Sequence, residues 1–234
     1  MMNIQQFRYG ADNLGYLLFG EKTAIAIDGG ATSAITDFLK QHGLSLSYVL
    51  NTHTHPDHTT GNGPLIQQTG AETIDIQTLV QKGAIELEGT LIRVYHTPGH
   101  SADSIVFHFN NILVSGDTLF VGKVGRCFTG DLKGFLASVK RLMALPPETV
   151  IYPGHDYVEE YLNTAKTIDP DNPHIDAFLK TYTPDHVYST LADEFKINPT
   201  LRFNAPAIIN RLKAEGLPHE NEYDRWASVI SLVT

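Results

Sequence analysis

The stretch NTHTHPDHTTGN, residues 51–62, gathers His53, His55, Asp57 and His58 within a few positions. His53 and His55 alternate along an extended segment, so their side chains can point to one side. Asp57 and His58 follow where the chain must turn. Such a turn cannot direct all four side chains at one atom, but it can serve two adjacent metal ions with two groups each. The stretch therefore predicts a site for a pair of metal ions.

Three further ligand candidates stand at the ends of apolar segments, each directly after a glycine: His100 in TPGHSADS, Asp117 in VSGDTLF and His155 in IYPGHDY. A glycine lets the backbone turn sharply and leaves room for a ligand. The whole set supplies about the number of ligands that two metals need when a carboxylate and a water are shared. Imidazole and carboxylate donors favour zinc, with iron or manganese as alternatives. The set contains no thiolate, which argues against a purely structural zinc site.

Composition indicates the class of protein and the cell compartment in which it acts. The chain has 234 residues, of which 42 % are hydrophobic, enough for one large domain or a domain with an appendage. A formal charge of −9 argues against a nucleic-acid-binding surface and means that an anionic small substrate needs a local basic pocket. Cys127 is the single cysteine, which fits a reducing compartment. We find no signal peptide and no membrane-spanning run, so we expect a soluble cytoplasmic protein without membrane or nucleic-acid partners.

Hydrophobic patterns predict a β-rich first part and a helical last part. Strands are expected in residues 14–20, 23–30, 46–55, 90–97, 104–110, 111–117 and 149–155, the last of these being the final strand. Helices are expected in residues 32–43, where Gly43 ends the helix, and in residues 133–143. Further helices are expected in residues 158–169, 173–182 and 204–216. We therefore predict an α+β fold with a β-rich domain at residues 1–157 and a helical region at residues 158–234.

The motifs THTHPDH (52–58), GH (99–100), GD (116–117) and GH (154–155) resemble the metallo-β-lactamase superfamily. The resemblance implies an αββα sandwich that carries two metals at one edge of its sheets. It assigns the side chains of His53, His55 and His100 to one metal. It assigns the other metal to the side chains of Asp57, His58 and His155, and it makes Asp117 the bridge.

The second half resembles glyoxalase II, the hydroxyacylglutathione hydrolases, over most of residues 10–204. The segments GDTLFVGKVGR (116–126), GHDY (154–157), AKTIDPDNPHI (165–175) and STLADEFKINPTLRFN (189–204) carry this similarity. It implies a substrate pocket that includes Arg126, Tyr157 and Arg202. Arg126 and Phe128 stand where the family commonly has lysine and tyrosine, and no basic residue directly follows Arg202. Arg126 can still pair with a carboxylate, whereas Phe128 cannot donate a hydrogen bond.

The expected reaction is hydrolysis of a glutathione-type thioester, with Asp57 and Asp117 as catalytic residues. Two metals lower the pKa of a shared water, the resulting hydroxide attacks the carbonyl, and the metals stabilise the oxyanion. A thiolate with a pKa of about 8.5 can leave without a dedicated acid. Asp28 either orients a metal ligand or is an ordinary turn residue.

Two alternatives remain open. His53, His100 and Asp117 could hold a single iron for oxygen chemistry, because VGRCFTGD (124–131) is somewhat similar to a segment of persulfide dioxygenases. A metal that only holds the fold together is the other alternative. Oxygen consumption with glutathione persulfide would favour the first, and a chain inert toward every thioester, lactone and phosphodiester would favour the second. The sequence does not indicate the oligomeric state.

Overall fold

Strand β3 (Thr23–Ile27) is apolar on both faces, and the computed structural model, which describes residues 2–233, covers it on both. Ile25 and Ile27 join a core between two sheets. Ala24 and Ala26 instead belong to a core under the helices on the outer face of the first sheet. Because successive side chains of a strand point to opposite faces, this pattern requires a layer on each side.

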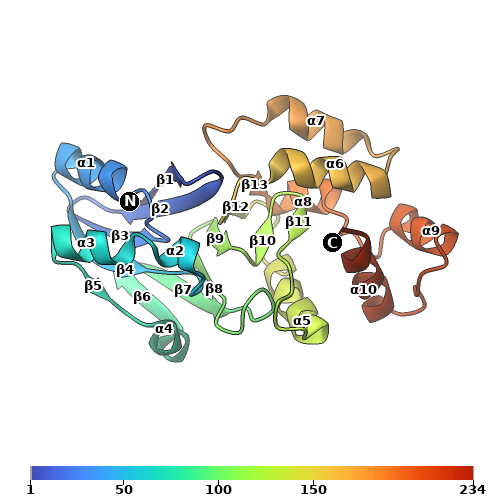
Figure 1. Ribbon diagram of the computed structural model, residues 1–234, viewed down its shortest axis with the longest axis horizontal. Helices are drawn as coiled ribbons and strands as arrows, with labels where there is room; N and C mark the ends of the chain where they lie inside the picture. The colour runs from blue at the N-terminus through green and yellow to red at the C-terminus, as the bar shows by residue number, and fades with distance from the viewer. Residues whose placement is uncertain (1, 234) are drawn as a thin grey trace.

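The two sheets are mixed, and they form the inner layers of the molecule (Figure 1). The first sheet runs in the order β1 (Asn3–Tyr9), β2 (Asn13–Phe19), β3, β4 (Ser45–Leu50) and β5 (Glu72–Thr73). The second runs in the order β13 (Ser189–Thr190), β12 (Val150–Pro153), β9 (Ile112–Gly116), β8 (Ile105–Phe109), β7 (Thr90–His96) and β6 (Ala84–Leu87). A separate small hairpin consists of β10 (Leu119–Phe120) and β11 (Lys123–Val124).

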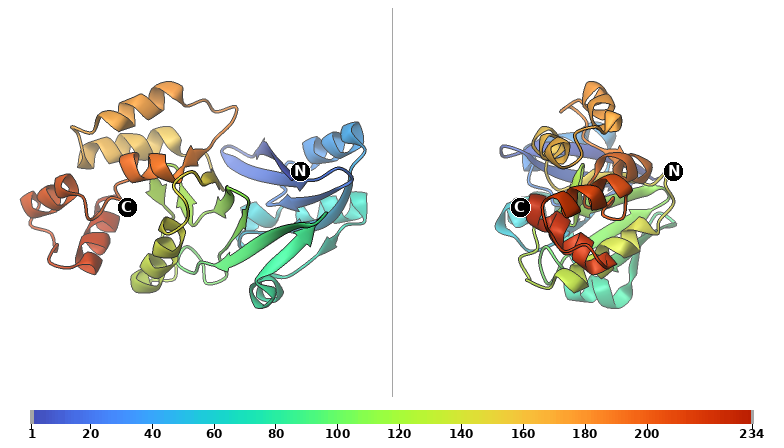
Figure 2. Two further views of the ribbon diagram at one scale, coloured as in Figure 1. Left: turned by 180° about the vertical axis from the view of Figure 1, so that it is seen from behind. Right: turned by 90° about the vertical axis from the view of Figure 1, so that its right-hand side faces the viewer.

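Helices cover the outer faces and extend the molecule beyond the second sheet (Figure 1). The first part contains α1 (Thr32–His42), α2 (Pro56–Thr59), α3 (Asn62–Thr69) and α4 (Ile76–Lys82). The later helices are α5 (Leu132–Met143), α6 (Val158–Ile168), α7 (Pro173–Thr181), α8 (Leu191–Ile197), α9 (Pro206–Ala214) and α10 (Glu222–Val233). In Figure 2, α1 and the pair α9 and α10 lie at opposite ends of the long axis.

A third core lies on the outer face of the second sheet. Leu113 and Ile151 of that sheet pack there with Phe135 of α5 and Trp226 of α10. The α10 helix was not predicted, although Trp226, Val229 and Val233 are spaced for one buried face. Helix, sheet, sheet and helix layers follow one another, so the predicted αββα arrangement is confirmed.

The last part of the chain is tied into the second sheet. Helix α6 begins at Val158, where the helical region was expected to start, but β13 pairs with β12 further along. The prediction that residues 149–155 form the final strand is therefore wrong, because Ser189 and Thr190 add an antiparallel strand of two residues. So short a strand has no periodic signal of its own. The division into residues 1–157 and 158–234 stays a prediction.

Helix α1 illustrates how local signals set these boundaries. It buries Ile35 and Leu39 on one face, and it ends at Gly43 with φ of 64°, as predicted. The left-handed conformation there lets the Gly43 backbone N–H bond carbonyls of the last helical turn. Among the helices of residues 2–233, none has the length and apolar character that a bilayer crossing requires.

Candidate metal centre

The predicted ligands follow the carboxyl ends of strands in both sheets. The histidine-rich turn follows β4, and His100 follows β7. Asp117 follows β9, and His155 follows β12, which runs parallel to β9. Loops at the carboxyl ends of parallel strands meet at one edge of the sheet, which is where proteins with open sheets bind their substrates and cofactors.

Two groups of side chains converge there. His55 is central to the first group, because its Nδ1 lies 2.9 Å from Nε2 of His53 and 3.0 Å from Nε2 of His100. The ligand atoms of these histidines lie within 4.8 Å of one another, close enough to surround one metal ion.

The second group joins Asp57, His58 and His155. Nε2 of His155 lies 3.2 Å from Nε2 of His58 and 3.3 Å from Oδ2 of Asp57. The Asp57 side chain is 47 % exposed, whereas both histidines are buried, so this group opens to solvent through its carboxylate.

Asp117 lies between the two groups. Its Oδ1 is 3.3 Å from Nε2 of His58, and its Oδ2 is 3.4 Å from Nε2 of His100 and 3.5 Å from Nε2 of His155. The structure thus brings together all seven predicted ligands, in the grouping that the family resemblance implied. Their roles as ligands remain a proposal, taken up below.

The close approach of Asp117 and His58 to the backbone beside His155 requires a glycine at position 154. A Cβ atom on Gly154 would stand 2.2 Å from Oδ1 of Asp117 and 2.9 Å from Cε1 of His58. Contacts this short do not occur in proteins, so a larger residue at position 154 would push the carboxylate and the imidazole apart.

Hydrogen bonds at the outer nitrogens fix the histidines of the second group. Nδ1 of His58 donates to Oδ2 of Asp28 at 2.9 Å, and Nδ1 of His155 donates to Oδ1 of Asp12 at 3.0 Å. In both rings the other nitrogen, Nε2, is turned inward. Two lone pairs 3.2 Å apart repel each other, so this arrangement requires a cation, either a proton or a metal ion.

The first group is oriented in the same way. Nδ1 of His100 donates to the carbonyl oxygen of Arg126 at 3.1 Å. Nδ1 of His53 lies 3.1 Å from the hydroxyl of Thr52, which already donates its proton to Asp28 and therefore accepts from the imidazole. Both rings then present Nε2 toward the centre.

The charges of the site favour a cation. Burial acts to lower the pKa of His58, but the carboxylates of Asp28 and Asp117 outweigh it and raise that pKa to about 11. Oδ1 of Asp117 is buried and makes no hydrogen bond to the described residues. A field that holds a proton on a buried imidazole also attracts a metal ion, and this carboxylate oxygen, which faces Nε2 of His58 at 3.3 Å, can serve as a ligand. The donor set therefore fits divalent metal ions.

Asp28 holds the imidazoles of two predicted ligands in place, directly or through Thr52, as one of the two expectations for it requires. This residue is 1 % exposed, with φ of 51°, and it accepts hydrogen bonds from the backbone and hydroxyl of Thr52 as well as from His58. Thr52 in turn accepts from His53. One carboxylate thus fixes an imidazole of each group.

The predicted substrate residues lie in different surroundings. Phe128 is 59 % exposed, and its ring centre lies 5.2 Å from that of His100. The guanidinium of Arg126 lies 5.1 Å from the centre of the Phe128 ring. Tyr157 stacks on His155 with ring centres 5.0 Å apart, so these residues flank both groups of ligands.

Arg202 is engaged elsewhere. Its guanidinium forms an ion pair with Asp169, the residue after α6, and both side chains are largely buried. This contact ties the segment after α8 to α6. A role of Arg202 in substrate binding stays a prediction.

Sequence reasoning missed Tyr9, Asp12 and Asn13 around the turn from β1 to β2. Asn13 Nδ2 donates to Oδ2 of Asp57 at 2.9 Å, and the Tyr9 hydroxyl donates to the backbone oxygen of Asp57 at 3.0 Å. A tyrosine at the end of one strand and short polar residues up to the start of the next look like an ordinary turn, so no signal in the pattern separated them from one.

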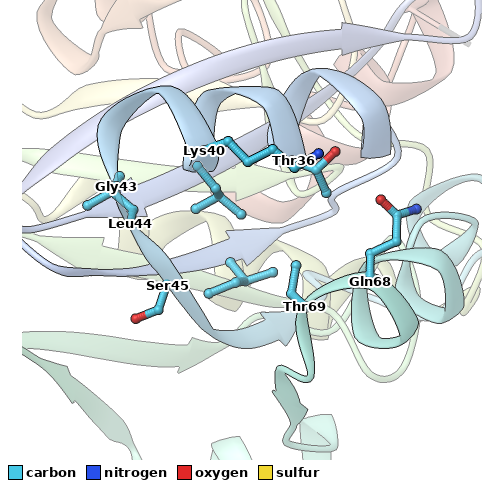
Figure 3. Close-up of a pocket in the computed structure, with 9 residues that line it drawn as sticks. Thr36, Lys40, Gly43, Leu44, Ser45, Gln68 and Thr69 are labelled. Carbon is cyan, nitrogen blue, oxygen red and sulfur yellow. The ribbon is translucent and has the colours of Figure 1, made fainter.

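Two cavities lie outside the cluster of ligands. One, of about 370 Å³, is bordered by Asp12 and Tyr157, both of which contact His155 of the second group. Another, of about 420 Å³, lies among α1, its following turn and α3 (Figure 3). None of the predicted ligands lines this second cavity, and Lys40 is its only charged residue.

Comparison with known proteins places this site in a family. The sequence profile of the metallo-beta-lactamase superfamily matches residues 12–78 and 72–155. A hydroxyacylglutathione hydrolase of Chromohalobacter salexigens is 32 % identical, and the match covers 88 % of each chain. A hydroxyacylglutathione hydrolase of Brucella ovis is also 32 % identical, over 94 % of this chain and 93 % of the relative.

A solved structure supports the fold. The crystal structure of ETHE1 from Myxococcus xanthus matches with a TM-score of 0.67 at 22 % identity, over 98 % of this chain and 90 % of that chain. The profile match and the 32 % identical relatives confirm the family resemblance drawn from the motifs. The chain belongs to the metallo-beta-lactamase superfamily and, within it, to the hydroxyacylglutathione hydrolases, a family of hydrolytic enzymes.

Proposed function

We propose that the chain hydrolyses glutathione-type thioesters with two divalent metal ions, zinc in the first place and iron or manganese as alternatives. His53, His55 and His100 would hold one ion, Asp57, His58 and His155 the other, and Asp117 would bridge them. The observation that carries the proposal is the convergence of inward nitrogens of both groups on the buried carboxylate of Asp117. Cys127, the only cysteine, fits action in the reducing cytoplasm.

The metal ions, when bound, supply Lewis acidity that lowers the pKa of a water molecule and polarises the thioester carbonyl. Asp57 is the most exposed of the acidic ligands, so its carboxylate can orient the attacking water. Burial acts to raise the pKa of Asp57, but His58 and the Asn13 hydrogen bond lower it, so this carboxylate stays ionised. The leaving thiolate needs no acid from the chain, since its pKa is about 8.5.

Charge around the centre suggests how an anionic thiol part would lie. The cavity beside Tyr157 is bordered by Asp12, Asp156, Glu159 and Glu160, which repel a carboxylate. On the other side, Arg126 is exposed above Phe128 next to the first group. We therefore infer that the carboxylates of a glutathionyl group lie toward Arg126 and that the ring of Phe128 packs against the acyl or thiol chain.

Metal analysis combined with turnover tests the proposal. We expect two metal equivalents per chain, hydrolysis of S-lactoylglutathione, and loss of most of this activity in Asp57→Ala. A preparation with one iron that consumes oxygen with glutathione persulfide would instead favour the dioxygenase alternative, which uses only His53, His100 and Asp117. That alternative leaves the convergence of Asp57, His58 and His155 unexplained.

The orientation of the substrate has its own test. We expect Arg126→Ala to raise KM for S-lactoylglutathione about tenfold and to leave an uncharged thioester such as an S-acyl N-acetylcysteamine unaffected. Arg93→Ala, which removes an exposed arginine on β7, is the matched control. An equal change for both substrates would contradict a contact between Arg126 and a carboxylate.

A further inference from the structure

The hairpin of β1 and β2 lies against only one of the two ligand groups. Asp12 accepts the Nδ1 proton of His155 at 3.0 Å. Asn13 donates to Oδ2 of Asp57 at 2.9 Å, and the Tyr9 hydroxyl donates to the backbone oxygen of Asp57 at 3.0 Å. Two of the three residues of the second group thus depend on this hairpin for their orientation.

The hairpin is itself fixed in place by backbone hydrogen bonds to the loop after β12. Leu14 N donates to the oxygen of Gly154 at 2.8 Å, and Asp156 N donates to the oxygen of Asp12 at 2.9 Å. Asn13 and His155 form an antiparallel bridge between these two bonds. The turn residues therefore cannot move away from His155 without breaking this pairing.

The first group takes its orientation from other parts of the chain. His100 donates to the carbonyl of Arg126, and His53 donates to Thr52. These supports lie beside β11 and after β4, and they do not involve the β1–β2 turn. Loss of the hairpin contacts should therefore leave the first group intact.

Asp57 has particular need of an outside support. It lies on α2, a helix of only four residues, and its side chain is 47 % exposed. So short a helix is not stable by itself, and an exposed carboxylate can adopt several rotamers. The bond from Asn13 selects the rotamer in which Oδ2 faces His58 and His155.

We propose that Tyr9, Asp12 and Asn13 are positioning residues that build the second metal subsite and not the first. The inference rests on the proposed metal pair. Hydrogen bonds to the outer atoms of ligands fix the tautomer and the orientation of those ligands, and their loss commonly costs 10–100-fold in metal affinity. Here we expect the loss of affinity only for the ion of the second subsite.

Zinc binding to the full chain tests this selectivity. We expect competition with a chelator to give two bound Zn²⁺ for the wild type. Asn13→Ala and Asp12→Ala should keep one Zn²⁺ at wild-type affinity and bind the other about 10–100-fold more weakly. Asn111→Ala is the matched control and should bind both ions normally, because Asn111 is exposed and its backbone oxygen, which the substitution keeps, accepts from Val150 N.

Conservative variants separate positioning from folding. Asp12→Asn keeps an acceptor for Nδ1 of His155 and should restore most of the affinity lost in Asp12→Ala. Tyr9→Phe removes only the hydroxyl and should weaken the same ion by a smaller factor. These two variants also decide the question if an alanine variant fails to fold, which circular dichroism would reveal.

The outcomes are distinguishable. Equal weakening of both ions, or two ions bound at wild-type affinity in every folded variant, would overturn the role of the hairpin and leave the proposed function standing. A wild-type chain that binds only one Zn²⁺ would overturn the proposed metal pair, and the inference would fall with it.

Discussion

Asp117 and Glu194 are both buried carboxylates, but their surroundings shift their pKa values in opposite directions. Burial acts to raise the pKa of Asp117, but His155 and His58 outweigh it and hold the pKa well below its usual range. Glu194 is completely buried, and burial raises its pKa to about 7. The difference lies in their neighbours, because one faces imidazoles and the other faces neutral donors.

The neighbours of Glu194 belong to a structural network. Its Oε2 accepts from Gly122 N at 3.0 Å and from Asn198 Nδ2 at 2.7 Å. Asn198 also accepts from Thr200, whose hydroxyl oxygen receives the N–H of Val124. This network joins α8 to the β10–β11 hairpin just before Arg126. Burial of a carboxylate therefore indicates a metal site only where basic nitrogens converge on it.

Replacement of Asp117 should give the largest effect. Asp117→Asn keeps the size of the side chain but removes the charge that both ligand groups share. We expect kcat/KM for thioester hydrolysis to fall on the order of 10³-fold, about 4 kcal/mol, with reduced metal content. Steady-state kinetics and metal analysis measure both.

Asp37→Asn, on the exposed side of α1, is the control and should change neither quantity. Activity in Asp117→Asn within tenfold of the wild type, at full metal content, would contradict the shared role of this carboxylate.

Glu194 should affect stability with a defined dependence on pH. Because the pKa rises from 4.5 in the unfolded chain to about 7 in the folded one, its stabilising contribution is complete below pH 4.5 and is lost as pH rises through 7. Glu194→Gln cannot ionise. We expect the free energy of unfolding of the variant, minus that of the wild type, to increase by about 3 kcal/mol between pH 4.5 and pH 8.

Urea denaturation across this pH range measures the difference. Glu148→Gln, which replaces an exposed acid in the turn before β12, is the matched control. A difference for Glu194→Gln that stayed constant with pH would mean that burial does not raise the pKa of Glu194, and the contrast with Asp117 would vanish.

Asp28 should show a smaller effect that is confined to metal binding and local packing. Oδ2 of Asp28 accepts both the hydroxyl of Thr52 and Nδ1 of His58. In Asp28→Asn an amide nitrogen in the place of this oxygen cannot accept either bond. We expect metal affinity to fall about 10–100-fold. Because Asp28 supports an imidazole in each group, both ions should weaken, unlike the result expected for Asn13→Ala. Chelator competition on the two variants makes the comparison, and weakening of a single ion in Asp28→Asn would contradict it.

The sequence predicted the ligands because their signal is local. His53 to His58 lie in one motif, and His100, Asp117 and His155 each follow a glycine at the end of a strand. The strands themselves were predicted from short apolar runs closed by turn residues. Their layer arrangement came from the family resemblance.

The supports of the ligands could not be predicted, because they come from distant parts of the chain. Asp12 meets His155 only through pairing between the β1–β2 turn and the loop after β12. Glu194 appeared in a family-like segment, but its burial depends on Gly122 and Asn198 being brought together. The engagement of Arg202 with Asp169 likewise needs α6 in place. Contacts of this kind follow from the fold and leave no spacing in the sequence.

Glu88 extends the comparison to an exposed carboxylate and should give the smallest effect. It lies in the β6–β7 turn, where Oε1 accepts from Lys22 N at 2.9 Å and from both the N–H and the hydroxyl of Thr23. Oε2 accepts from Glu21 N at 2.8 Å. The Thr23 hydroxyl and these backbone donors lower the pKa to about 2. Hydrogen-bond donors of the β2–β3 turn thus lower the pKa of Glu88, as imidazoles lower that of Asp117.

Because the folded pKa lies below the unfolded value of 4.5, the stabilising contribution of Glu88 is complete above pH 4.5 and is lost as pH falls toward 2. Glu88→Gln turns an amide N–H₂ toward backbone donors, so it should lower the urea midpoint at pH 7 slightly and by less at pH 3. Glu86→Gln on β6 is the matched control. Zinc binding should be unchanged, since these bonds join turns away from every predicted ligand. If the urea midpoint of Glu88→Gln were below that of the wild type by the same amount at pH 3 and at pH 7, Glu88 would stabilise the β2–β3 turn through its shape and not through its charge.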